Sequence, residues 1–142
     1  MFVGEYSHTI DAKGRLIVPS KLRDGLGDSF MITKGLDHCL YVYTKEEWEQ
    51  FLEKLSALPM TNAESRKFVR FFLSGATEAE PDKTGRILIP ASLRAHADLD
   101  KDVMFLGMGN KIEIWNKDKW DEADYSDMEQ IAERLDELGF GI

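Results

Sequence analysis

The chain has 142 residues, of which 43% are hydrophobic and 31% are charged, and this composition is typical of a folded globular protein rather than a disordered one. Its single cysteine, Cys39, excludes an internal disulfide framework and favours a reducing cytoplasm, while no uninterrupted apolar run is long enough to span a bilayer. The formal net charge of −8 repels phosphate, so taken alone it argues against a nucleic-acid partner.

The first half of the chain predicts short strands and helices in alternation. The expected elements are, in order, a strand over 2–10, a turn over 11–14, a buried strand over 15–18, a helix over 19–26, strands over 30–34 and 40–43, and a longer helix after them. Thr44 and Glu47 have the spacing of a capping box, so Thr44 caps this longer helix, and Pro59 stops it.

The second half predicts a similar series after a linker that begins at Met60. The expected elements are a helix over 63–73, strands over 75–80, 86–89, 102–106 and 111–115, and helices over 117–123, capped by Asn116, and 127–138. Gly109 and Asn110 predict a two-residue hairpin between the last two strands. The final helix has an apolar face formed by Met128, Ile131, Leu135 and Leu138.

One motif occurs twice and relates the two halves. The first copy reads DAKGRLIVP from Asp11, and the second reads DKTGRILIP from Asp82, 71 positions later. Beyond the motif the halves stay aligned at an offset of 72, with glycines, aromatics and strand alternation in matching positions. Two copies are too few for a solenoid, so we expect a pseudo-twofold pair packed on itself.

Each copy of the motif is predicted to hold an arginine beside a tight turn. Asp11 and Asp82 shape the turns with their side chains, and Gly14 and Gly85 supply the positive φ that closes them. The residue after each glycine is an arginine, so a guanidinium is expected at the mouth of each turn.

Positive and negative side chains are segregated along the chain. Cations gather in and after the two motifs, whereas nine acidic residues lie between positions 118 and 137. A protein that is acidic overall can still present a cationic face within a Debye length of about 8–10 Å of a ligand. The net charge therefore does not exclude DNA.

The sequence does not indicate a catalytic or cofactor site. The three histidines, His8, His38 and His96, lie far apart and never at metal-ligand spacing. Cys39 next to His38 is a weak nucleophile candidate, because neighbours on a strand point to opposite faces. Phosphate-loop, dinucleotide and serine-hydrolase motifs are missing from the sequence. We therefore expect no metal, no cofactor and no enzymatic activity.

The doubled Asp-x-x-Gly-Arg motif, each copy followed by an apolar strand and a proline, resembles the MraZ family of bacterial transcriptional regulators. The resemblance covers nearly the whole chain and implies an α+β fold. In that fold two tandem SpoVT-AbrB-type swapped-hairpin halves intertwine into one pseudo-twofold, double-psi barrel-like body with peripheral helices. The halves are expected at 5–58 and 75–123, joined by a helical segment at 59–74 and followed by a helical tail at 124–142.

The resemblance also implies a function. A protein of this kind binds double-stranded DNA sequence-specifically and regulates transcription, recognising repeated short boxes upstream of its own operon of division and cell-wall genes. It does so as a homo-oligomer, a closed ring such as an octamer. It is cytoplasmic and associated with the nucleoid, with no membrane and no small-molecule substrate as partners.

Carried over residue by residue, the family's Asp-x-x-x-Arg pairs fall on Asp11 with Arg15 and on Asp82 with Arg86. The two arginines are expected to reach the major groove or the phosphates. Lys13 has Thr84 as its counterpart, so the first loop is the stronger candidate for reading bases. The expected DNA-binding residues are Arg15, Lys13, Arg86, Lys83, Lys21 and Arg23, and the turn-shaping residues are Asp11, Gly14, Asp82 and Gly85.

Three other interpretations stay open at this point. The motif can be a stable turn whose arginine simply pairs with its aspartate, with Lys21 and Arg23 solvating a helix face. The chain can be a protein-binding module of the antitoxin type, since each half resembles a swapped hairpin. It can also be an enzyme on a related double-psi barrel, which would need a nucleophile that the sequence does not offer.

Overall fold

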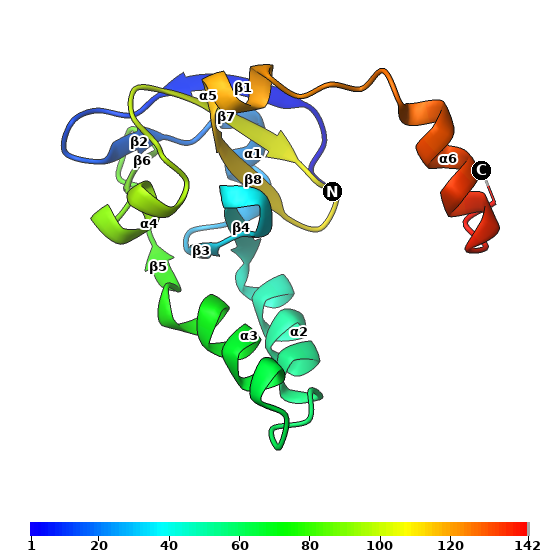
Figure 1. Ribbon diagram of the computed structural model, residues 1–142. Coiled ribbons are helices and arrows are strands. Elements are labelled where there is room, and N and C mark those ends of the chain that lie inside the picture. The colour runs from blue at the N-terminus through cyan, green and yellow to red at the C-terminus, as the bar shows by residue number, and fades with distance from the viewer. Residues whose placement is uncertain (142) are drawn as a thin grey trace.

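Strands from both halves of the chain share one antiparallel sheet. The computed structural model describes residues 1–141 (Figure 1). The sheet has six strands in the order β1 (Glu5–Thr9), β7 (Asp102–Gly107), β8 (Ile112–Asn116), β4 (Leu40–Thr44), β3 (Phe30–Lys34) and β5 (Thr77–Ala79). Because β7 and β8 lie between β1 and β4, the two halves are interleaved rather than placed side by side. The expected mixed α+β class is confirmed.

The two copies of the motif also pair with each other. Strand β2 (Arg15–Ile17) and strand β6 (Arg86–Leu88) form a separate two-stranded antiparallel ribbon in which Leu16 lies opposite Ile87. A single bridge between Ile10 and Leu16 links this ribbon to the chain that follows β1. The two copies of the repeat thus pack against each other, as the sequence predicts.

Matching residues of the two copies build the core. Leu16, Val18 and Leu22 from the first copy and Ile87, Ile89 and Leu93 from the second are all almost completely buried. They join Phe30, Ile32, Phe105, Ile112 and Ile114 from the six-stranded sheet in one continuous cluster. Because both copies feed the same cluster, neither half has a separate core.

Two short helices follow the ribbon strands, α1 (Ser20–Leu26) and α4 (Ala91–His96), and each begins after the proline of its motif. Two longer helices, α2 (Lys45–Ser56) and α3 (Ala63–Ser74), form a hairpin that projects from the body in Figure 1. The predicted cap at the start of α2 is confirmed, because the Glu47 amide donates to Thr44 Oγ1 at 3.1 Å. Aromatic contacts fix the hairpin to the sheet, because the ring of Phe51 stacks on Tyr43 and meets Phe72 edge to face.

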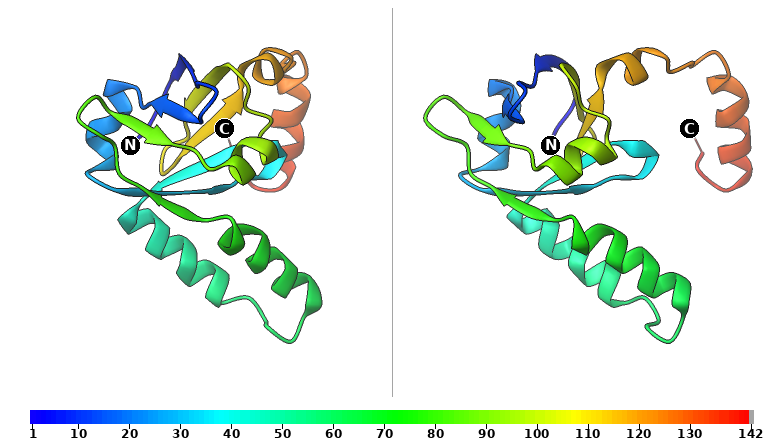
Figure 2. Two further views of the ribbon diagram at one scale, coloured as in Figure 1. Left: turned by 90° about the vertical axis from the view of Figure 1, so that its left-hand side faces the viewer. Right: turned by 60° about the vertical axis from the view of Figure 1, so that its left-hand side comes forward.

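The helices after the second copy differ from those after the first. Helix α5 (Lys117–Asp121) is two residues shorter than predicted and has less than half the length of α2. Helix α6 (Met128–Glu137) stands away from the body in Figures 1 and 2, at the end of an irregular segment. Within residues 1–141, no helix combines the length and apolar character that crossing a membrane requires.

Several predicted strand boundaries differ from the structure by one to three residues, among them those of the strands expected over 2–10, 75–80 and 111–115. The expected strand over 2–10 is shortened to β1 because Gly4 has φ +89°, which interrupts the extended backbone. The predicted two-residue hairpin between β7 and β8 is close to the observed turn, since the Met108 amide donates to the Lys111 carbonyl at 2.8 Å around Gly109 and Asn110. Gly109 additionally bridges to Phe2, which ties the N-terminus to this turn.

Candidate nucleic-acid interface

The first loop of the motif is organised by the carboxylate of Asp11. Its Oδ1 accepts the backbone amides of Lys13 at 3.0 Å and Arg15 at 2.9 Å, and its Oδ2 accepts Nε of Arg15 at 2.6 Å. These hydrogen bonds, above all the one from the Arg15 amide, lower the pKa of Asp11. Both side chains of the ion pair are about 40% exposed, so the pair orients the arginine at the surface rather than burying it.

The second loop repeats this arrangement with one addition. Asp82 Oδ1 accepts the backbone amides of Thr84 and Arg86, and Oδ2 accepts Nε of Arg86 at 3.0 Å. The Thr84 hydroxyl also donates to Asp82 Oδ1 at 2.7 Å, and this bond is the largest cause of the lowered pKa of Asp82. Thr84 therefore tightens the turn, where its counterpart Lys13 contributes an exposed cation.

The β2–β6 ribbon brings the two arginines onto one exposed face. Residues directly opposite each other in an antiparallel pair point to the same side, and here Arg15 lies opposite Leu88 and Ile17 lies opposite Arg86. Diagonal partners on such a face are about 7–8 Å apart. Leu16 and Ile87, between these pairs, point into the core, so we name the outward surface formed by Arg15, Ile17, Arg86 and Leu88 the ribbon face.

Each turn glycine receives a side chain from the other copy. A methyl group at Gly14 would lie 2.7 Å from Nε of Arg94, and one at Gly85 would overlap the guanidinium of Arg23. Backbone hydrogen bonds also connect the two copies. The Val18 amide donates to the Gly85 carbonyl at 3.0 Å, and the Ile89 amide donates to the Gly14 carbonyl at 2.8 Å. These glycines are thus required for contact between the copies as well as for their positive φ.

The six predicted DNA-binding residues occupy two kinds of position. Lys13, Lys21, Lys83 and Arg86 are exposed and Arg15 is partly exposed, around the loops and the ribbon face. Arg23 is half-buried, and it donates through Nη2 to the Val18 carbonyl at 2.9 Å. Its Nε is buried without a hydrogen-bond partner among the described residues. Arg23 therefore lies at the joint between the copies, with one side facing a hollow that Lys83 also lines.

Sequence reasoning missed two features of this surface. The apolar runs after the arginines were expected to be buried strands, but Ile17 is 43% exposed and Leu88 is 60% exposed. Their alternation with buried Leu16 and Ile87 has the period of two that indicates a half-buried strand, and that signal was overlooked. The second feature is Arg94, whose Nε donates to the Ile89 carbonyl at 3.0 Å and mirrors Arg23.

The structure also locates the residues that were considered for catalysis. Cys39 is buried and its Sγ contacts the Leu36 carbonyl at 3.1 Å, and burial raises the pKa of the thiol. A neutral, enclosed thiol is a poor nucleophile. In residues 1–141 no group of three or more His, Cys, Asp or Glu side chains is arranged to hold a metal ion.

The duplicated turn–strand–helix unit, whose two copies interlock and present paired arginines, is the feature that relates this protein to known ones. A family model described as "MraZ protein, putative antitoxin-like" matches the chain in two segments, residues 1–71 and 72–137, and the chain belongs to the MraZ family. It is 55% identical to the "Transcriptional regulator MraZ" of Lachnoclostridium phytofermentans over 142 residues, the full length of both chains. It is 56% identical to the protein of that name from Thermoanaerobacter pseudethanolicus over 141 residues, covering 97% of this chain and 99% of the relative. The Clostridium tetani protein of that name is 53% identical over 98% of this chain and 99% of its own length.

Proposed function

We propose that this protein is a transcriptional regulator that binds double-stranded DNA sequence-specifically and needs no catalysis or cofactor. The observation that carries the proposal is the ribbon face, on which Arg15 and Arg86 stand at diagonal corners, each held by its own aspartate. The name that the full-length relatives carry, transcriptional regulator, supports the same function.

The geometry of the arginines suits recognition of guanine. In each loop Nε is the guanidinium atom that hydrogen-bonds the aspartate within the described residues, which leaves the terminal amino groups as donors. A guanidinium can donate two parallel hydrogen bonds to O6 and N7 of guanine, worth about 1–3 kcal/mol of discrimination. Because the aspartates fix the side chains before binding, little rotamer entropy is lost on contact. Arg15 and Arg86 are thus assigned to base edges.

The exposed lysines are assigned to the phosphates. Lys13 and Lys83 are exposed on the two loops. Lys21, on α1, lines a hollow together with Ile17. Arg23 is assigned to the joint that holds the loops in register, because its guanidinium is already enclosed against Gly85 and Val18. One subunit offers few cations and carries a net charge of −8, so a single subunit should bind weakly.

We further propose that several subunits act together as a closed ring, such as an octamer, on repeated short boxes upstream of the protein's own operon. In such a ring each subunit adds weak contacts with a neighbouring box, and avidity raises the affinity well above that of one subunit. The protein would then be cytoplasmic and associated with the nucleoid.

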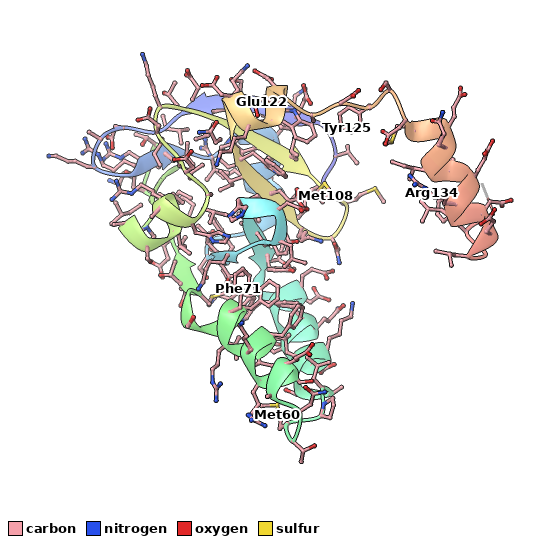
Figure 3. The ribbon with its side chains drawn as sticks, in the orientation of Figure 1. Met60, Phe71, Met108, Glu122, Tyr125 and Arg134 are labelled. Atoms are coloured by element: carbon pink, nitrogen blue, oxygen red, sulfur yellow. The ribbon has the colours of Figure 1, made fainter. Side chains whose placement is uncertain are left out.

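Helix α6 and the α2–α3 hairpin are the proposed contact between subunits. The apolar side chains of Met128 and Leu135 on α6, and of Leu138 just after it, are exposed, and α5 is too short to cover them as α2 covers α3. On α3, Phe68 is 43% exposed and borders a hollow of about 550 Å³ with Phe71, Leu36 and Lys67. Figure 3 marks the two surfaces with Arg134 on α6 and Phe71 on α3.

Charge supports a second copy as the occupant of this hollow. Helix α6 carries four acidic residues and one arginine, whereas α3 carries Arg66, Lys67 and Arg70 against a single Glu64. An acidic amphipathic helix from one subunit is therefore complementary to the basic hairpin of the next.

We also propose the finer architecture of the two halves, on the basis of the contacts between the copies. The exchange of contacts between the copies is the pattern expected of two swapped-hairpin halves in a double-psi barrel-like body. The proposed boundaries are 5–58 and 75–123 for the halves, 59–74 for the connecting helical segment and 124–142 for the tail.

Selection of bound duplexes from a random DNA pool tests the function. The intact protein should enrich a short, repeated sequence that contains guanine, and Arg15→Ala and Arg86→Ala should abolish or relax that enrichment. An exposed ion pair contributes about 0–1 kcal/mol to stability, so both variants should stay folded. The function is refuted if the intact protein enriches no sequence at modest ionic strength.

Lys117→Ala is the matched control. It removes a surface ion pair of the same i, i+4 spacing, in which Lys117 Nζ lies 2.6 Å from Asp121, away from the ribbon face. It should leave the selected sequence unchanged. An equal weakening of binding in Lys117→Ala and Arg15→Ala would mean that the arginines have no specific role.

A further inference from the structure

Two aliphatic side chains stand exposed between the arginines of the ribbon face. Ile17 is 43% exposed and Leu88 is 60% exposed, although the residues that alternate with them, Leu16 and Ile87, are 1% and 3% exposed. Strand positions that only meet water are commonly polar, whereas large aliphatic residues on an exposed strand face indicate a contact surface.

The register fixes where these aliphatic groups lie relative to the arginines. Ile17 is directly opposite Arg86, and Leu88 is directly opposite Arg15, so each guanidinium has one aliphatic neighbour across the ribbon. Cβ atoms of directly opposed residues are about 4.5–5.5 Å apart. Adjacent base pairs are stacked about 3.4 Å apart. The separation of one cross-strand pair exceeds one base-pair step by only about 1–2 Å, so the two side chains of a pair can reach two neighbouring base pairs.

The chemistry of the pair matches the major groove. Guanine offers O6 and N7 as acceptors for arginine, and thymine offers the C5-methyl group, which is the apolar group that the base edges present there. An aliphatic side chain beside a guanidinium thus complements a thymine next to a guanine.

Resting on the proposed function, we propose that Ile17 and Leu88 contact thymine methyl groups in the major groove. Each acts with the arginine opposite, Ile17 with Arg86 and Leu88 with Arg15, so that one ribbon reads two guanine–thymine steps related by the pseudo-twofold of the repeat. Sequence preference then comes from four side chains rather than from the arginines alone.

Replacing thymine by deoxyuridine in the selected duplex tests the inference, because this change removes only the methyl group. The intact protein should bind the deoxyuridine duplex about threefold to fivefold more weakly for each recognised methyl group that is removed. Substitution of one thymine at a time should locate the sensitive positions next to the guanines that Arg15 and Arg86 require.

Two variants assign the effect to these side chains. Ile17→Ala and Leu88→Ala should bind the thymine duplex more weakly, and each should no longer discriminate between thymine and deoxyuridine at one position. Met108→Ala is the matched control, since Met108 is 46% exposed but lies at the turn between β7 and β8, outside the ribbon face. It should keep full discrimination, and thermal unfolding of each variant checks that the fold is intact.

The possible failures are distinguishable. Equal affinity of the intact protein for thymine and deoxyuridine duplexes overturns methyl recognition, while binding that still depends on Arg15 keeps the proposed function. If Ile17→Ala and Leu88→Ala dissociate the assembly and leave discrimination intact, the two side chains contact another subunit and the inference is wrong. If no duplex is selected at all, the proposed function and this inference both fail.

Discussion

The guanidinium of Arg23 lies directly over the α-carbon of Gly85, a residue 62 positions later that belongs to the other copy of the motif. Arg94 lies against Gly14 in the same manner. Each loop therefore packs against an arginine side chain of the other copy. The arrangement of the ribbon face and of the core depends on this exchange of arginines between the copies.

Substitution of Gly85 should be more destabilising than backbone strain alone explains. Gly85 has φ +83° and Gly109 has φ +82°, but a side chain at Gly109 would meet nothing within 4 Å. We expect Gly109→Ala to lower the free energy of unfolding by about 1–2 kcal/mol through strain. Gly85→Ala should cost roughly 1–3 kcal/mol more, because Arg23 must move. Urea denaturation measures both, and equal decreases in stability would contradict the contact.

The lowered pKa of Asp82 depends chiefly on Thr84. Because a lowered carboxyl pKa means that the folded state holds the proton less tightly, this group stabilises the fold above pH 3.8 and loses that contribution as the pH falls below it. Thr84→Ala should raise the pKa of Asp82 toward its ordinary value and leave Asp11 unchanged. Carboxyl titration by nuclear magnetic resonance checks this, and an unmoved Asp82 would show that the hydroxyl bond is unimportant.

His8 should titrate below its ordinary value. Burial is the main cause of its lowered pKa, and the charge of Arg23 is the second. The unfolded chain therefore binds this proton more readily, so the contribution of His8 to stability is complete above pH 6.5 and decreases as the pH falls through that value. Arg23→Gln should raise the pKa only in part, because burial remains. Imidazole titration measures the shift, and a full return to 6.5 would assign the whole effect to Arg23.

The salt dependence of DNA affinity should identify the phosphate contacts. Lys13→Ala should weaken binding to all duplexes alike and reduce the slope of log affinity against log salt by about 1. Lys119→Ala, an exposed lysine on α5, should leave the slope unchanged. Fluorescence anisotropy at several salt concentrations measures both slopes. If the two variants had identical slopes, Lys13 would not be a phosphate contact.

A charge on the apolar face of α6 should disperse the assembly. Leu135→Glu places a carboxylate where the proposed contact is apolar, so sedimentation should move toward the 16.2 kDa of one chain. Gln130→Glu adds the same charge on the polar side of the helix and should not change the mass. An intact protein that already sediments as one chain would refute the ring, and dispersal by both variants would refute the assigned face.

Much of the local structure was predictable because its hydrogen bonds join residues within four positions of each other. The Asp11–Arg15 and Asp82–Arg86 pairs, the Thr44 cap and the Asn116 cap are all of this kind, and each occurs where the sequence predicts it. The repeat likewise predicted that the two copies pack on each other, and β2 pairs with β6.

The length of α5 and the position of α6 were not predictable in this way. Helix α2 extends to Ser56, whereas α5, its counterpart in the second half, ends at Asp121. Among the described residues, helix α6 therefore has no long neighbouring helix to cover it in the way that α2 covers α3. Helix ends depend on tertiary packing as much as on propensity, and residues 122–127, which follow α5, are all exposed.

By itself the sequence determined the two loops, because a carboxylate, a glycine and an arginine at fixed short spacing close the same turn wherever they occur. Only the tertiary structure decided which side chains those turns present. The exchange of Arg23 and Arg94 between the copies, and the exposure of Ile17 and Leu88 beside the arginines, follow from contacts between segments about seventy residues apart. Such contacts depend on how the whole core packs, and no local pattern specifies them.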